Sequence, residues 1–170
     1  TLATAADAAA ANAGYDFLVA TADRVDGNSG LLARAERLGQ RVDGAIIVDV
    51  SDNDSLLERL IEKLDIPVVT VGCSHPKWPS VTIDNHHVGV IAGQHLAQLG
   101  HGSVAALSLA TPSGITIDNM SDRILGCRSA MPDAAIRETI LPRSETSERR
   151  HLILDAVGDA TAVFCTSDEL

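Results

Sequence analysis

The chain has 170 residues, of which 45% are hydrophobic, and 13 basic against 23 acidic residues give it a formal net charge of −10. The apolar content is enough for a sizeable core, whereas the negative charge argues against direct binding of nucleic acid by this part of the protein. No apolar run approaches the roughly 20 residues that cross a bilayer, and no signal peptide opens the chain. We therefore expect no membrane partner.

The first half of the chain predicts three helices that alternate with three strands. The expected helices are 1–13, 31–38 and 56–64, and the expected strands are 15–21, 44–50 and 66–71. The valine and isoleucine runs show little polar alternation, which predicts strands buried on both faces in a parallel sheet flanked by helices. Because the alternation begins with a helix, we expect a first strand before Thr1 that was cut off or is disordered.

The segment 81–107 predicts a strand, a capped helix over 85–99 and a second strand in continuous order. Asp84 or Asn85 can accept the first free N–H groups of this helix, and Gly100 fits the left-handed position that ends it. Apolar residues and one histidine recur at helical spacing: Val88, Ile91, Ala92, His95, Leu96 and Leu99. We therefore expect this segment to form a βαβ unit.

The second half continues the same alternation. The expected elements are strand 103–108, loop 109–120, helix 121–131, strand 136–141, helix 146–157 and strand 161–166. Pro132 ends the helix 121–131. The predicted fold class is α/β, with two doubly wound parallel-sheet lobes that are incomplete at both ends. We expect an N-terminal lobe over 1–83 and a C-terminal lobe over 84–170, joined near 81–84.

Ligands of open parallel sheets bind beyond the carboxyl ends of the strands, where loops converge. This rule selects six places: 21–23, 49–51, 72–74, Asp84, 109–113 and 167–168. Thr21, Gly72, Cys73 and Asp84 are therefore candidate ligand-binding residues. If two lobes face each other, these places share one cleft, where a polar neutral ligand such as a sugar would need a few fixed donors and acceptors.

Other site chemistries find little support in the spacing. The histidines include no i, i+4 pair that would favour a metal site, and Cys73 has no assignable base, so it is better interpreted as a core or cleft-wall cysteine. The run 27–30 (GNSG) lacks the pattern of a phosphate-binding loop. We therefore expect no metal, no cofactor and no enzymatic activity. The three cysteines are far apart and odd in number, which favours a reducing, cytoplasmic location.

Four motifs in order resemble the effector-binding domain of LacI/GalR-family transcription regulators. They are V-x-x-D-N at 81–85, H-L-x-x-L-G-H at 95–101, R-x-x-G within 121–126 (SDRILG), and S-D-E-L at 167–170. The resemblance implies a periplasmic-binding-protein-like fold that binds a small metabolite between two lobes, forms a homodimer, and contacts operator DNA only through a separate helix-turn-helix module upstream of Thr1.

The same resemblance selects two ligand-binding residues. Arg123 matches the arginine of R-x-x-G, which reaches the ligand in relatives, and Asp168 matches the acidic residue after the later strand. Alternatively, Arg123 is a helix-surface arginine that stabilises a nearby carboxylate, and Asp168 is a helix N-cap. Two positions depart from the family pattern: Gly72 replaces an acidic residue found in many sugar-responsive relatives, and Glu145 lies where an aromatic residue is common.

Three classes of function follow. We expect the effector-sensing and dimerising domain of a LacI/GalR-type regulator. A periplasmic sugar-binding protein of a transporter is the alternative, because it shares the two-lobe plan. An α/β enzyme is the third class, and the sequence offers it no catalytic constellation.

Overall fold

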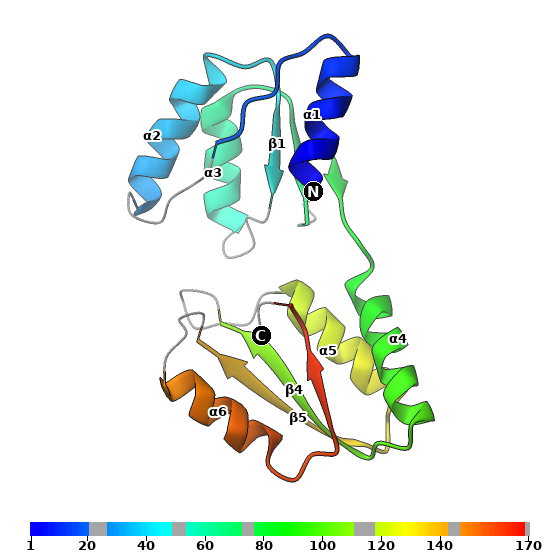
Figure 1. Ribbon diagram of the computed structural model, residues 1–170. Coiled ribbons are helices and arrows are strands. Elements are labelled where there is room, and N and C mark those ends of the chain that lie inside the picture. Colours follow the sequence, from blue (N-terminus) through cyan, green and yellow to red (C-terminus); the bar gives the residue numbers. More distant parts are fainter. Residues whose placement is uncertain (21–26, 49–53, 73–76, 111–117, 143–146, 169–170) are drawn as a thin grey trace. The chain divides into compact units, whose positions relative to one another are not determined.

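The computed structural model describes residues 1–20, 27–48, 54–72, 77–110, 118–142 and 147–168. Helices and strands alternate along the chain (Figure 1). The helices are α1 (Leu2–Asn12), α2 (Gly27–Gly39), α3 (Asp54–Leu64), α4 (Asn85–Gln98), α5 (Asp118–Ala130) and α6 (Ser147–Val157). The strands are β1 (Ala45–Val48), β2 (Val68–Val71), β3 (Ser80–Val81), β4 (Ser103–Leu109), β5 (Ala135–Leu141) and β6 (Ala162–Cys165).

The first sheet has the order β1-β2-β3, and both of its strand pairs are parallel. The register pairs Ala45 with Val68 and Val71 with Val81. Because α3 connects β1 to its parallel neighbour β2, this part of the chain has the helical crossover that parallel strands require.

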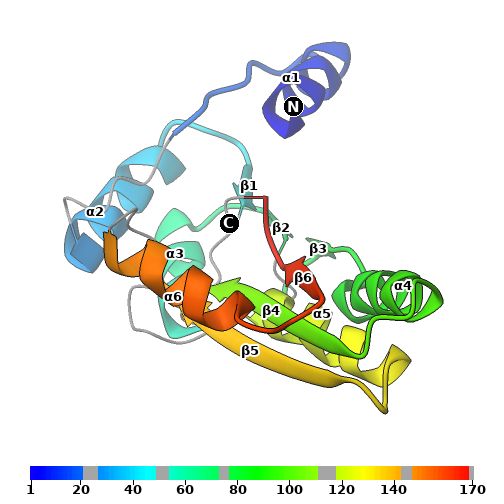
Figure 2. The ribbon, with the colours of Figure 1, turned by 60° about the horizontal axis from the view of Figure 1, so that its bottom comes forward.

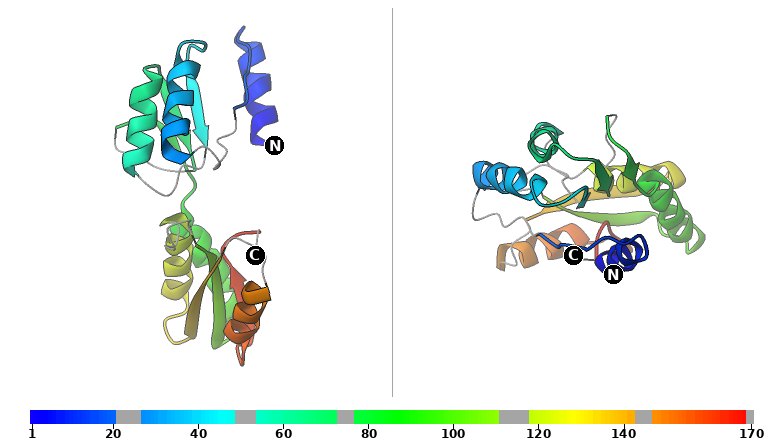
Figure 3. Two further views of the ribbon diagram at one scale, coloured as in Figure 1. Left: turned by 90° about the vertical axis from the view of Figure 1, so that its left-hand side faces the viewer. Right: turned by 90° about the horizontal axis from the view of Figure 1, so that it is seen from above.

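The second sheet has the order β5-β4-β6, and all of its pairs are parallel (Figure 2). Helices cover both faces: α4 and α5 lie on one side and α6 on the other, as the left-hand view of Figure 3 shows. One apolar cluster forms around Leu107, Leu109 and Leu141, with Ala156 of α6. The other forms around Val104, with Cys127 and Met131. The predicted α/β class with parallel, helix-flanked sheets is therefore confirmed. The βαβ unit predicted over 81–107 is wrong, because β3 and β4, the strands on either side of α4, belong to different sheets.

Burial on both faces is confirmed for the central strand β4, where every residue from Val104 to Leu109 is buried. The prediction is wrong for β1 and β6, in which burial alternates. Ile46 and Val48 are each about half exposed, at 51% and 50%. Apolar composition predicts the strand, but the number of covered faces depends on the neighbouring elements, which the composition does not encode.

The strand expected over 15–21 is not formed by its described residues, 15–20. This segment is extended and largely exposed, with Tyr15 at 59% and Val19 at 63%. A strand exists only with a neighbour that completes its hydrogen-bond ladder, and no described segment pairs with it. The first strand expected before Thr1 stays a prediction.

Contacts within the chain divide it into two compact units. One comprises Thr1–Asp43 with Glu58–Ile66, and the other comprises Gly44–Leu57 with Pro67–Leu170. The division into lobes at 83/84 stays a prediction. No helix of the described residues is long and apolar enough to cross a membrane.

Candidate functional site

The side chain of Arg123 joins three elements of the second unit. Arg123 lies on α5, and its Nε donates a hydrogen bond to Oδ1 of Asn85, at the start of α4, at 2.9 Å. Its Nη1 donates to the backbone carbonyl of Thr166, directly after β6. The guanidinium is thereby held at the carboxyl end of a parallel strand, beside the place 167–168 that the position rule for ligand sites selects.

The amide of Asn85 is itself oriented. Its Nδ2 donates to the carbonyl of Ile83 at 3.3 Å, which leaves Oδ1 as the acceptor for Arg123. Sequence reasoning treated Asn85 only as a possible helix cap. The structure gives it a second function, because its side chain links the start of α4 to α5.

Three glycines allow α4 and α5 to touch through their backbones. A Cβ atom on Gly89 would lie 1.9 Å from the carbonyl oxygen of Arg123, and one on Gly126 would lie 1.9 Å from that of His86. One on Gly93 would lie 2.6 Å from the carbonyl oxygen of Cys127. Gly89 and Gly93 are four residues apart and so share one face of α4. This G-x-x-x-G spacing is the sequence signal that could have predicted the contact.

The packed face of α4 agrees only in part with the apolar spacing: Leu96 packs against the cluster around Val104, but other residues of the predicted face do not. Gly89 and Gly93 are its buried residues, whereas Val88, Ile91 and Leu99 are 37%, 55% and 61% exposed. The sequence predicted that the face with the larger apolar residues is buried, because an amphipathic helix packs its apolar stripe against the core. Close approach of two helix backbones requires small residues instead, and Gly89 and Gly93 therefore face α5.

Of the two capping residues that the sequence allowed, Asp84 is the N-cap of α4. Its Oδ1 accepts a hydrogen bond from the backbone N–H of His87 at 2.8 Å. At the other end of the helix, Gly100 has φ +81°, the left-handed conformation that the sequence indicated. The cap bond gives Asp84 a structural role, and a ligand contact by this carboxylate stays a prediction.

Asp168 lies two residues after the carbonyl that binds Arg123, so both predicted ligand residues are placed at the same end of β6. Asp168 is exposed, and its Oδ1 accepts a hydrogen bond from the Ser167 hydroxyl at 3.5 Å. The alternative for Arg123, pairing with a carboxylate, is not seen among the described residues, where both partners are uncharged oxygens. The cap alternative for Asp168 concerns residues beyond those described.

Of the remaining predicted site residues, Gly72 is described by the structure, whereas Thr21 and Cys73 are not. Gly72 directly follows β2, its N–H donates to the carbonyl of Val81 at 3.0 Å, and its φ is +87°. Thr21 and Cys73 lie outside the described residues, as does Glu145. The structure thus places Arg123, Asp84 and Asp168 on connected elements of the second unit, and a ligand role for Gly72, Thr21 and Cys73 stays a prediction.

Two buried hydroxyl groups lie at the carboxyl ends of β4 and β6. The backbone N–H of Thr166 donates to Leu107 at 3.0 Å, which continues the β4–β6 register and places Thr166 beside Ser108. Ser108 is 0% and Thr166 is 2% exposed, and neither hydroxyl oxygen has a hydrogen-bond partner among the described residues. The same holds for Oδ1 of Asn119, one turn before Arg123 on α5. Sequence reasoning did not identify these residues.

The two described cysteines are free thiols. Burial raises the pKa of Cys127, an effect that the nearby Arg128 partly offsets, and burial also raises the pKa of Cys165. A raised pKa keeps a thiol protonated, the opposite of what a nucleophile needs. Nowhere in the described ranges do three or more His, Cys, Asp or Glu side chains gather as metal ligands would.

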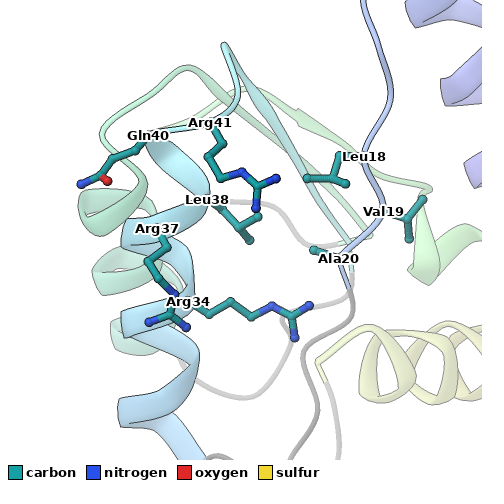
Figure 4. Close-up of a pocket in the computed structure, with 8 residues that line it drawn as sticks. All are labelled: Leu18, Val19, Ala20, Arg34, Arg37, Leu38, Gln40 and Arg41. Atoms are coloured by element: carbon teal, nitrogen blue, oxygen red, sulfur yellow. The ribbon is translucent and has the colours of Figure 1, made fainter.

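A cavity of about 670 Å³ lies in the first unit, between α2 and the extended segment 15–20 (Figure 4). Its described lining combines three arginines with apolar side chains: Leu18, Val19, Ala20, Arg34, Arg37, Leu38, Gln40 and Arg41. None of the predicted ligand residues is among this described lining. The hydrogen-bonded group around Arg123 is therefore the candidate site.

Sequence comparison identifies one family. The family model described as periplasmic binding proteins and sugar binding domain of LacI family matches residues 1–138. This range includes Asn85 and Arg123, and Asp168 lies outside it. None of the curated proteins matches the chain in sequence.

Solved structures show the same fold. The transcriptional regulator CelR in complex with cellobiose has a TM-score of 0.72 at 23% identity, over 96% of this chain and 51% of that one. The Cra regulator of Pseudomonas putida with fructose 1-phosphate has 0.73 at 19%, over 96% and 62%. A periplasmic solute-binding protein of an ABC transporter from Actinobacillus succinogenes, with bound D-allose, has 0.72 at 20%, over 98% and 63%. The chain thus spans between 51% and 63% of the length of these proteins.

Proposed function

The chain belongs to the family of periplasmic binding proteins and LacI-family sugar-binding domains, and from this membership we propose that it senses a small sugar-like effector for a transcription regulator. The observation that carries the proposal is the family match over residues 1–138, which includes the arginine of the R-x-x-G motif. Arg123 supplies N–H donors at a strand end, which is the chemistry that sugar hydroxyls require.

The sugar class is supported by what similar proteins bind. Cellobiose, fructose 1-phosphate and D-allose occupy the three structures described above. Many of their polar atoms are hydroxyl oxygens, which both donate and accept hydrogen bonds. Arg123 would donate to such an oxygen, and the exposed carboxylate of Asp168 would accept from one. Together the two residues provide the complementary groups.

The regulatory mechanism follows from differential affinity. An effector shifts the equilibrium between two arrangements of a domain only by the difference between its affinities for them. We propose that a DNA-binding helix-turn-helix module coupled to this domain experiences that shift, in a cytoplasmic homodimer. The formal charge of −10 supports a separate module for operator DNA, because this chain would itself repel phosphate groups. Enzymatic turnover has no place in this proposal.

A periplasmic sugar-binding protein of a transporter is the second candidate. The D-allose-bound protein of Actinobacillus succinogenes favours it, since this fold serves transport there. The two candidates differ in what the ligand changes: operator affinity in a regulator, and delivery to a membrane complex in a transport protein.

The decisive experiment measures sugar binding and its dependence on Arg123. Isothermal titration calorimetry of the full chain would use glucose, galactose, D-allose, cellobiose and fructose 1-phosphate. We expect binding of at least one sugar, and a loss of about tenfold or more in affinity for Arg123→Ala, because hydrogen bonds from a charged donor to a ligand are lost.

Arg128→Ala is the matched control. This arginine lies on the same helix, is 46% exposed and pairs with Glu138 at 3.8 Å. Its removal is expected to leave sugar affinity unchanged. Equal affinities of the wild type and Arg123→Ala, or binding of none of the five sugars, would contradict the proposed function.

A further inference from the structure

Arginine has a long side chain, so the position of its guanidinium is poorly defined unless other groups fix it. Ordering such a side chain costs conformational entropy, and a ligand that has to order it binds more weakly. In this chain two bonds already fix it: Nε donates to Asn85 Oδ1, and Nη1 donates to the Thr166 carbonyl. Both acceptors belong to the protein itself.

The two acceptors are themselves rigidly placed. The Thr166 carbonyl directly follows β6. The N–H of the same residue adds one more hydrogen bond to the ladder between β6 and β4. Asn85 is the first residue of α4, which Asp84 caps, and its own amide donates to Ile83. The glycine contacts hold α4 against α5, the helix that carries Arg123.

The bonds also select which donors stay available. A guanidinium has five N–H groups, and Asn85 and Thr166 use one on Nε and one on Nη1. Among the described residues Nη2 has no hydrogen-bond partner, although Arg123 is only partly exposed. The two N–H groups of Nη2 and the second N–H of Nη1 therefore remain as donors, in one defined orientation.

We propose that Asn85 is a positioning residue, which together with the Thr166 carbonyl orients the Arg123 guanidinium so that its Nη2 end binds an oxygen of the effector. This inference rests on the proposed function for the ligand, but the bonds that set the orientation are made by groups of the protein. Asn85 acts through Arg123 and does not contact the effector.

The test uses two substitutions of Asn85 in the full chain. Asn85→Leu keeps a similar volume and removes the acceptor, whereas Asn85→Asp retains an acceptor oxygen for Nε. With the tightest-binding sugar of the five named above, we expect Asn85→Leu to lower affinity about tenfold. Asn85→Asp is expected to restore affinity to within about threefold of the wild type. Gln94→Leu, at an exposed amide of the same helix, is the control and should change nothing.

A double mutant separates positioning from a general structural effect. In an Arg123→Ala background, Asn85→Leu should cause no further loss of sugar affinity, because the group that it orients is gone. An equal loss in both backgrounds would overturn the proposal, and so would wild-type affinity of Asn85→Leu. If Arg123→Ala itself leaves affinity unchanged, the proposed site fails, which is a distinguishable result.

A measurement without ligand decides the orientation directly. In a ¹⁵N spectrum, the Nε–H of Arg123, assigned by its loss in Arg123→Ala, should exchange slowly with water in the wild type and in Asn85→Asp, and quickly in Asn85→Leu. Rapid exchange in the wild type would overturn the proposal even if sugars bind. Protection that Asn85→Leu removes would support it even if none of the five sugars binds.

Discussion

Gly126 lies against the backbone of His86, so that a Cβ atom at Gly126 would come within 1.9 Å of the His86 carbonyl oxygen. The neighbouring atom belongs to a helix backbone and cannot rotate away. The distance between α4 and α5 is therefore set by the absence of a side chain, and the bond from Arg123 to Asn85 depends on that distance.

Gly126→Ala should destabilise the protein although alanine is the better helix former. Forcing the helices apart is expected to lower the free energy of unfolding by about 1–3 kcal/mol. Urea denaturation followed by circular dichroism measures it. Gly102→Ala is the control, because a Cβ atom there meets no other atom within 4 Å. An unchanged midpoint for Gly126→Ala would contradict the close contact.

Asp84→Ala should remove the N-cap of α4. The carboxylate accepts the His87 N–H at 2.8 Å, and loss of such a cap costs about 1 kcal/mol. Asp84→Asn keeps a good capping group and is expected to have close to wild-type stability. Thermal unfolding of the two variants checks this difference, and equal melting temperatures would show that the cap contributes nothing.

Thr166→Val should preserve or increase stability. The Thr166 hydroxyl is buried without a hydrogen-bond partner among the described residues, and valine has nearly the same shape without that group. The expected gain is up to about 1 kcal/mol in the free energy of unfolding.

Thr161→Val provides the contrast for this substitution. The Thr161 hydroxyl donates to the Ser103 carbonyl at 3.0 Å and lies 3.0 Å from the His101 ring nitrogen, so its removal should lower stability. Urea denaturation compares both variants. A loss of about 1 kcal/mol or more in Thr166→Val would mean that its hydroxyl does have a partner.

Cys127 should make stability depend on pH in the alkaline range. Burial raises the pKa of this thiol above its ordinary value of 9.0, so the folded state keeps a proton that the unfolded state releases. The contribution to stability is fully present below about pH 9 and is lost as the pH rises through the raised pKa.

Urea denaturation of the wild type and of Cys127→Ala at pH 8 and pH 10 measures this effect. The fall in stability between the two pH values should be smaller in Cys127→Ala, which has no thiol to titrate. The other titrating groups are common to both proteins. Equal falls would show that burial of Cys127 does not perturb its ionisation.

Order and type of most elements could be predicted, because apolar runs bounded by glycine, proline and capping residues encode them locally. Asp84 and Gly100 marked both ends of α4 correctly. The segment 15–20 shows the limit: its apolar composition suits a strand, but a strand depends on a neighbour that the segment itself does not encode.

The candidate site could be predicted only in part. The family motif identified Arg123, and the strand-end rule identified the region of Asp168. The bond from Arg123 to Asn85 spans 38 positions along the chain, and it depends on how two helices pack. The packing in turn depends on Gly89, Gly93 and Gly126, whereas an amphipathic pattern directs attention to large residues.

Asn85 also connects the two sheets along the chain, because only residues 82–84 separate it from β3, the last strand of the first sheet. An effector bound at the Nη2 end of Arg123 would be linked through the guanidinium to Asn85, and so to the connecting peptide. Sugar recognition and mechanical signalling would then use the same hydrogen bond. A variant that recognises sugar normally but transmits no signal should consequently be found at Thr82 or Ile83 and not in α5.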